Sequence, residues 1–235
     1  IYLQVTERDY TRLYRYNPAD DRYESIPLPV EVLDRIDYDL AGRRAVFSGT
    51  GASTPEKLYL LDLPGKTSRL IDFPKAEQLK DVRFGACRDW NFVNRKGDTI
   101  SGRFYLPVGY QEGRTYPLIV NYYGGTTPVE RSFGGRYPIE VWAAAGYLVY
   151  VLQPSGATGF GQDFSALHVN GWGFEAIDDI IEGTKAFLAA HPAADARNVG
   201  CIGASYGGYT TMLLQTRTDI FKTAVAHAGI SDITS

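Results

Sequence analysis

Residues 198–215 read NVGCIGASYGGYTTMLLQ, and this stretch decides which fold the sequence predicts. The apolar run Asn198–Gly203 has the length of a buried strand, and Tyr209–Gln215 has the composition of a helix. Between them, GASYG at residues 203–207 has the G-x-S-x-G pattern, which holds a serine on a sharp turn from strand to helix. The glycines are needed because side chains there would collide with the neighbouring strand or helix. We therefore expect Ser205 to project its hydroxyl above the edge of a sheet.

Strands alternate with helices over residues 81–235, which surround this turn. The helix expected at Glu175–Ala190 has apolar residues every three or four positions, and Asp178 and Asp179 near its start suit the helix dipole. The other elements expected here are strands at Ile100–Leu106, Leu118–Tyr123, Tyr147–Leu152 and Thr223–Ala228, and a helix at Ile139–Ala145. The alternation predicts a mostly parallel sheet with helices on both faces.

Residues 1–80 differ, because they contain short strand-like runs separated by turn formers. The runs are Ile1–Thr6, Leu13–Tyr16, Ala45–Ser48, Lys57–Asp62 and Ser68–Phe73. Arg12–Asn17 resembles Lys57–Asp62, 45 residues later, and one four-stranded propeller blade takes about 40–45 residues. Two copies cannot close a ring, so we interpret residues 1–80 as the C-terminal blades of a β-propeller. A small β-sandwich remains the alternative.

Composition excludes several classes of partner. The chain has 24 Lys and Arg against 27 Asp and Glu and no run of like charges, which argues against nucleic acid as a partner. The longest apolar stretch, Ala143–Leu152, contains Gly146 and is far shorter than the ~20 residues of a membrane span. The N-terminus has neither a signal-peptide pattern nor an initiator Met, so we expect the chain to be part of a longer protein.

The residues that commonly bind metals or form disulfides are sparse. Only Cys87 and Cys201 occur, and Cys201 lies in a run typical of a buried strand, so we expect no disulfide framework. The three histidines are scattered, which argues against a metal site, and no cofactor-binding motif is present. Secreted, periplasmic and cytoplasmic locations all stay open.

A nucleophilic serine needs donors for the oxyanion that develops during acyl transfer. In a G-x-S-x-G turn one donor is the backbone N–H of the following residue, here Tyr206. The second should come from the loop that ends an earlier strand. Residues 121–126, NYYGGT, end the strand Leu118–Tyr123, and the phenols of Tyr122 and Tyr123 are the candidates there.

Four segments together resemble the prolyl oligopeptidase family of serine peptidases, in its dipeptidyl-peptidase and acylaminoacyl-peptidase-like branches. They are SYGGY at 205–209, YGG at 123–125, SGATGFG at 155–161 and GISD at 229–232. The resemblance implies a β-propeller at residues 1–80, followed by the N-terminal part of an α/β-hydrolase domain at 81–235. The expected fold is therefore mixed: partial propeller blades and then a truncated α/β-hydrolase.

The resemblance also implies roles for individual residues. Ser205 would be the acylating nucleophile, and Tyr206 N–H would be one oxyanion donor. The Tyr123 hydroxyl would be the second donor, with Tyr122 as the fallback. Ile230 and Ile233 would be apolar walls of the pocket for the residue before the scissile bond. Ile233, where the family often has an aromatic residue, and Ser155, where many members carry arginine, depart from the pattern.

A serine hydroxyl also needs a histidine base and a carboxylate, which hydrolases of this fold present in the order Ser, Asp or Glu, His. Asp219 and His227 obey that order by position. However, a helix rises about 1.5 Å per residue, which would carry the chain on the order of 15 Å from Ser205 by Asp219. We therefore expect the triad acid and base beyond Ser235, and we expect this chain alone to be inactive.

The sequence therefore predicts that the parent protein is a serine exopeptidase or oligopeptidase that hydrolyses short peptides through an acyl-enzyme. An esterase of the same fold is one alternative. A propeller and hydrolase-like module that binds peptide without catalysis is another. A strained serine turn argues against the latter. The sequence leaves a homo-oligomer open.

Overall fold

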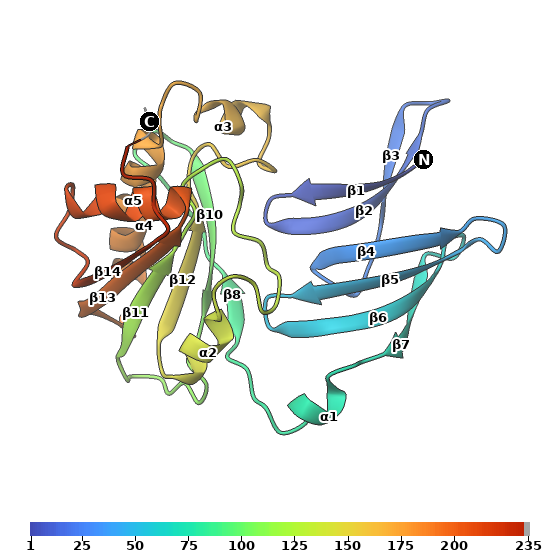
Figure 1. Cartoon of the computed structure of the whole chain (residues 1–235), viewed down its shortest axis with the longest axis horizontal. Coiled ribbons are helices and arrows are strands. Elements are labelled where there is room, and N and C mark those ends of the chain that lie inside the picture. The colour runs from blue at the N-terminus through green and yellow to red at the C-terminus, as the bar shows by residue number, and fades with distance from the viewer. Residues whose placement is uncertain (233–235) are drawn as a thin grey trace. The chain divides into compact units, whose positions relative to one another are not determined.

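The computed structural model describes residues 1–232, which form two compact units with a sheet each (Figure 1). The first unit comprises Ile1–Arg83 and Glu130–Tyr137, and the second comprises Phe84–Val129 and the chain from Pro138 onward. The segment Glu130–Tyr137 therefore clusters with the first unit, although it lies in the sequence assigned to the second part.

The sheet of the first unit consists of two antiparallel meanders. Its strands are β1 (Tyr2–Glu7), β2 (Tyr10–Asn17), β3 (Arg22–Ile26), β4 (Val32–Asp39), β5 (Arg44–Gly51), β6 (Thr54–Asp62) and β7 (Thr67–Asp72). Strands β1–β3 pair in sequence, as do β4–β7, and the strand pairing between the meanders consists of Thr11 on β2 with Val32 on β4. The unit also contains the short helix α1 (Ala76–Leu79).

The two similar stretches of sequence occupy equivalent places in these meanders. Arg12–Asn17 lies on β2, between β1 and β3, and Lys57–Asp62 lies on β6, between β5 and β7. Their burial differs, because Leu13 is fully buried while its counterpart Leu58 is half-buried. The repeat therefore describes strand order better than it describes which side chains form the core.

A buried ion pair holds the segment Glu130–Tyr137 within the first unit. Arg131 Nε lies 3.1 Å from Asp9 Oδ2, and both side chains are 6% exposed. The same guanidinium pairs with Glu31 at 3.2 Å and stacks 4.3 Å from the centre of the Tyr10 ring. Since an unpaired buried charge is costly, the loss of Asp9 would destabilise this unit strongly.

The sheet of the second unit has the strand order β14-β13-β11-β12-β10-β8, with β9 paired to β10. Its strands are β8 (Cys87–Asp89), β9 (Phe92–Val93), β10 (Thr99–Tyr105), β11 (Tyr116–Asn121), β12 (Leu148–Gln153), β13 (Ala194–Ala204) and β14 (Thr223–His227). Strands β11, β12, β13 and β14 pair in parallel, whereas β10 runs antiparallel to β12. The sheet is therefore mixed and mostly parallel.

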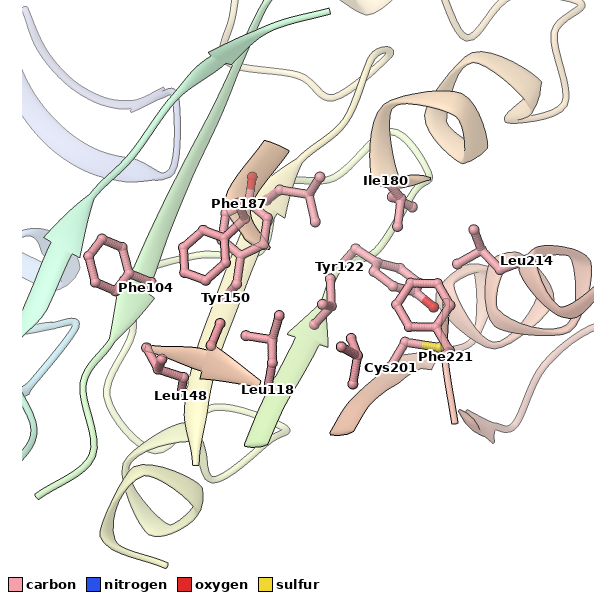
Figure 2. Packing of buried hydrophobic residues seen from close by; sticks show 14 of the residues in the cluster. Phe104, Leu118, Tyr122, Leu148, Tyr150, Ile180, Phe187, Cys201, Leu214 and Phe221 are labelled. Carbon is pink, nitrogen blue, oxygen red and sulfur yellow. The ribbon is translucent and has the colours of Figure 1, made fainter. Parts of the chain in front are cut away.

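Helices connect the parallel strands, as parallel pairing requires. They are α2 (Ile139–Ala144), α3 (Gln162–Ala166), α4 (Phe174–Ala190) and α5 (Tyr206–Gln215). Side chains of α4 and α5, including Ile180, Phe187 and Leu214, share one buried cluster with Leu118 and Tyr150 of the sheet (Figure 2). None of the helices within residues 1–232 is long and apolar enough to cross a membrane.

The structure differs from the sequence-based expectations in several places, including the short elements α1, α3, β8 and β9, which were not expected. Helix α5 begins at Tyr206, directly after the serine, rather than at Tyr209. Strands β3 and β4 were not expected, because both are rich in exposed charged residues. The strand expected at Asn198–Gly203 begins earlier, at Ala194.

Candidate active site

Strand order places the predicted site residues at one position along the sheet edge. From β11 the chain passes to β12 on one side, and β13 then pairs with β11 on the other side. Ligands in open α/β sheets bind at the carboxyl ends of the strands where the order reverses in this way. Asn121 ends β11 and Ala204 ends β13. The loop with Tyr123 and the turn with Ser205 therefore leave the sheet side by side.

Ser205 occupies a strained turn between β13 and α5. Its φ is +55° and its ψ is −117°, a combination that residues with a side chain rarely adopt. Its N–H donates to the carbonyl of His227 at 2.9 Å, and its carbonyl accepts from the N–H groups of Gly208 and Tyr209 at 2.9 and 3.1 Å. The backbone is thus held on both sides of the side chain. Ser205 is half-buried at the end of the sheet.

The two motif glycines allow close backbone contacts around this turn. A Cβ at Gly203 would lie 2.4 Å from the carbonyl oxygen of Gly207, far inside contact distance. A Cβ at Gly207 would lie 3.1 and 3.2 Å from the carbonyl oxygens of Tyr122 and Tyr123. The first position excludes a side chain, and the second allows the loop with Tyr123 to lie close to α5.

Tyr206 supplies a backbone donor and a half-buried ring. Its N–H lies in the first turn of α5, where no intrahelical acceptor exists. Its ring contacts those of Tyr123, His168 and Tyr209, with centroids 6.2, 5.3 and 5.3 Å away. Burial raises the pKa of the Tyr206 phenol to about 12, with smaller contributions from Tyr209 and Tyr123. This hydroxyl has no hydrogen-bond partner among the described residues.

The structure separates the two candidate phenols. Tyr122 is 1% exposed, and its hydroxyl lies 3.0 Å from Oγ1 of Thr211 in the core. Tyr123 is half-buried beside Tyr206, and Gly125 makes room for its ring, because a Cβ there would lie 2.8 Å from Tyr123 Cε1. Tyr122 is therefore a core residue, and Tyr123 is the phenol that lies on the side of the Ser205 turn.

Two polar residues near the turn were missed from the sequence. Asn121, 1% exposed, donates from Nδ2 to the carbonyl of Ile202 at 2.9 Å, while its Oδ1 is buried without a partner. Thr210 donates to the carbonyl of Tyr206 at 3.0 Å and lies 3.5 Å from the carbonyl of Tyr123. Asn121 therefore joins the ends of β11 and β13, and Thr210 joins α5 to the loop with Tyr123. A threonine on an otherwise apolar helix face is the only sequence signal for either.

Of the remaining residues considered for the site, the structure describes Ile230 and His227 but not Ile233. Ile230 follows β14 and is 46% exposed. Ile233 lies outside the described residues. His227 ends β14, opposite Ala204, and strand alternation puts its side chain on the face of Thr223 and Val225.

Residues that bind metals do not gather in the described part of the chain. Across residues 1–232 no group of three or more His, Cys, Asp or Glu side chains is placed to hold a metal ion. Cys87 and Cys201 are not joined in a disulfide. His191 Nδ1 lies 3.0 Å from the carbonyl of Phe187, at the end of α4. The chemistry that this arrangement can perform is therefore that of a hydroxyl beside an N–H and a phenol.

Comparisons with known proteins agree with this geometry. Residues 133–235 match the profile of the prolyl oligopeptidase family. The chain is 25% identical to the uncharacterised peptidase YuxL of Bacillus subtilis, over 98% of this chain and 35% of that protein. It is 32% identical to dipeptidyl peptidase 8 of Homo sapiens, over 60% of this chain and 16% of that protein.

A solved structure extends the similarity to the fold. The acylaminoacyl peptidase of Pyrococcus horikoshii superposes with a TM-score of 0.86 at 26% identity, covering 98% of this chain and 36% of that one. The chain thus spans about a third of the length of YuxL and of this peptidase. These matches confirm the resemblance predicted from the sequence: residues 133–235, which carry Ser205, match the prolyl oligopeptidase family, and a peptidase and a solved acylaminoacyl peptidase are similar over 98% of the chain.

Proposed function

We propose that the protein containing this chain is a serine peptidase in which Ser205 forms an acyl-enzyme. The observation that carries the proposal is the strained Ser205 turn at the reversal of strand order. The Tyr206 N–H is free there, and Tyr123 lies on the same side. In the reaction, the Ser205 oxygen attacks the carbonyl carbon while its proton passes to a general base, and the two donors stabilise the oxyanion. Collapse of this intermediate breaks the scissile C–N bond, and the base gives the proton to the leaving amine, so that the acyl-enzyme remains.

The proposal extends to the identity of the two units. Residues 1–80 would be the C-terminal blades of a propeller, and residues 81–235 would be the N-terminal part of an α/β-hydrolase domain. Two meanders joined by one residue pair support the former. A mostly parallel sheet with the serine turn between strand and helix supports the latter.

The substrate class follows from the relatives. The names of two of them describe a dipeptidyl peptidase and an acylaminoacyl peptidase, so we propose short peptides as substrates. Ile230, exposed after β14, would contact the residue before the scissile bond. Ile233 would do the same.

The proposal does not assign the general base to His227. Its backbone carbonyl already holds the Ser205 N–H, and its side chain lies on the sheet face shared with Thr223 and Val225. We place the triad acid and base in the sequence beyond Ser235. His227→Ala should then leave hydrolysis unchanged, whereas a loss of activity in a folded variant would restore the short triad.

The test is hydrolysis by the full-length protein of three substrates: a dipeptide anilide, an N-acylated amino-acid anilide and an activated ester. We expect turnover of at least one anilide and a loss of at least about 10⁴-fold in Ser205→Ala. Turnover of the ester without either anilide would favour an esterase. Peptide binding without turnover of any substrate would favour a binding module and contradict the proposal.

A further inference from the structure

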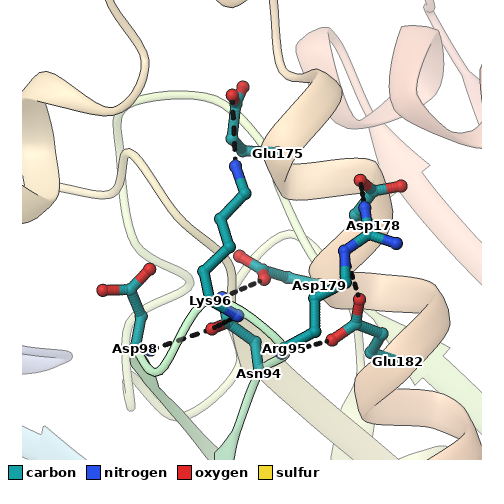
Figure 3. A network of polar contacts seen from close by, with 8 residues as sticks. All are labelled: Asn94, Arg95, Lys96, Asp98, Glu175, Asp178, Asp179 and Glu182. Atoms are coloured by element: carbon teal, nitrogen blue, oxygen red, sulfur yellow. Dashed lines mark hydrogen bonds and ion pairs between the residues drawn. The ribbon is translucent and has the colours of Figure 1, made fainter.

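A buried carboxylate, that of Asp179 on α4, lies within a network of polar contacts (Figure 3). Asp179 is 3% exposed; its Oδ1 accepts from Asn94 Nδ2 and its Oδ2 from the backbone N–H of Ser155, both at 2.8 Å. Its neighbour Asp178 instead pairs at the surface with Arg95. Burial raises the pKa of the Asp179 carboxyl, while the Ser155 and Asn94 hydrogen bonds lower it. Removing a carboxylate from water is costly, so its retention calls for a structural reason.

The loop that Asp179 holds leads to the proposed oxyanion phenol. Residues 154–157, which follow β12, are all buried. The next residue, Thr158, donates its N–H to the carbonyl of Thr126 at 2.8 Å. Thr126 is three residues after Tyr123 in the same loop. A shift of residues 154–158 would therefore move the segment that carries the Tyr123 phenol.

The same loop also leads to the residue that follows the nucleophile. Gly156 has a φ of +95°, and a Cβ there would lie 2.8 Å from Cβ of His168. The His168 ring in turn contacts the Tyr206 ring, with centroids 5.3 Å apart. One buried loop therefore touches the surroundings of both oxyanion donors.

We infer that Asp179 is a positioning residue for the oxyanion hole, acting through the loop at residues 154–158 on Tyr123 and Tyr206. It does not touch the substrate. This inference rests on the proposed function, since it presupposes that these two residues stabilise an oxyanion. A misplacement of about 1 Å in such a site can lower the rate about 100-fold.

The pattern of donors and acceptors around Asp179 gives a sharp test. In Asp179→Asn the carboxamide can still accept from Ser155 N–H, but its NH₂ group then faces the Asn94 Nδ2 donor. The double variant Asn94→Asp/Asp179→Asn exchanges donor and acceptor. The carboxylate introduced at position 94 can still accept from the N–H groups of Lys96 and Asp98, as Asn94 Oδ1 does at 3.0 and 2.9 Å.

The measurement is the rate at which a fluorophosphonate labels Ser205 in the full-length protein, together with kcat and KM for the best substrate. We expect Asp179→Asn to lower the labelling rate and kcat about 10- to 100-fold with little change in KM. The double variant should recover most of both. Asp178→Asn, which loses only a surface ion pair, is the matched control and should label at the wild-type rate.

The outcomes separate this inference from the proposed function. If wild-type Ser205 is not labelled, the proposed function fails. If the wild type is labelled and folded Asp179→Asn is labelled equally fast, only the positioning role fails. A folded double variant that stays as slow as Asp179→Asn also contradicts that role. If Asp179→Asn does not fold, Asn94→Ala, which removes one donor to the carboxylate, takes its place: a lower kcat supports the role and a wild-type kcat overturns it.

Discussion

Strained backbone occurs in both units, but in different surroundings. In the first unit, residues with a side chain and positive φ lie in the hairpin turns: Arg8, Asp21, Arg43 and Lys66. In the second unit Asn170, Trp172, Ser205 and Ala228 have positive φ, and Ser205, at +55°, lies half-buried between a parallel strand and a helix. Hairpins need such conformations merely to reverse the chain. A positive φ therefore indicates a functional residue only where chain reversal does not require it.

The largest effect expected from this comparison concerns one glycine beside each kind of turn. Gly203→Ala brings a Cβ to 2.4 Å from the backbone oxygen of Gly207, whereas Gly65→Ala meets only the flexible Asp62 side chain at 2.5 Å. We expect Gly203→Ala to lower fluorophosphonate labelling about 1,000-fold or more, since it displaces the nucleophile and the Tyr206 donor together.

Gly65→Ala is the matched control for this glycine pair. It should change the free energy of unfolding by only about 0.5 kcal/mol and leave labelling intact. Thermal unfolding and labelling of both variants check this. Equal effects of Gly203→Ala and Gly65→Ala on labelling would contradict the distinction between the hairpin turns and the Ser205 turn.

An intermediate effect is expected from the two adjacent tyrosines. Tyr123→Phe should lower kcat about 100-fold, because it removes an oxyanion donor, while stability stays near that of the wild type. Tyr122→Phe should lower the free energy of unfolding by about 1 kcal/mol, because it removes the Tyr122–Thr211 hydrogen bond, with kcat nearly unchanged. Steady-state kinetics and denaturant titration separate the two. A reversed pattern would assign the oxyanion phenol to Tyr122.

The smallest effect concerns the two thiols. Burial raises the pKa of Cys201 to about 11, so only about one thiol in a thousand is ionised at pH 8. Cys87 is half-buried on β8. In the native protein a disulfide reagent should therefore modify Cys87 faster than Cys201, and both fast only after unfolding. Rapid modification of Cys201 in the native protein, located by peptide mapping, would show that the core around β13 opens easily.

Hydrophobic periodicity predicted most of the second unit. Strands buried on both faces, such as β11 and β12, read as continuous apolar runs, and α4 has a clear apolar stripe. Strand β4 was missed because Asp34, Arg35 and Asp37 interrupt its apolar residues. Arg35 and Asp37 pair with β5, and Asp34 lies at a shift in the register of that pairing. Pairing between strands depends on residues that are distant in sequence, so the pattern of a few consecutive residues does not reveal it.

The site was predictable where chemistry is local and unpredictable where partners are distant. Ser205 and Tyr206 are specified by a five-residue motif. Asp179 had been interpreted from its place near a helix start, yet its side chain is buried against Asn94, 85 residues earlier. Tyr122 and Tyr123 likewise could not be told apart as oxyanion candidates from the sequence, because the hydrogen bond that places Tyr122 in the core is made with Thr211, 89 residues away.

The proposed peptidase activity depends most on the Ser205 hydroxyl, so the most direct measurement is covalent labelling of the full-length protein with a fluorophosphonate, followed by peptide mapping. We expect one adduct, on Ser205, and none in the Ser205→Ala variant. A folded wild-type protein that acquires no adduct at Ser205, or the same adduct yield in Ser205→Ala, would contradict the account.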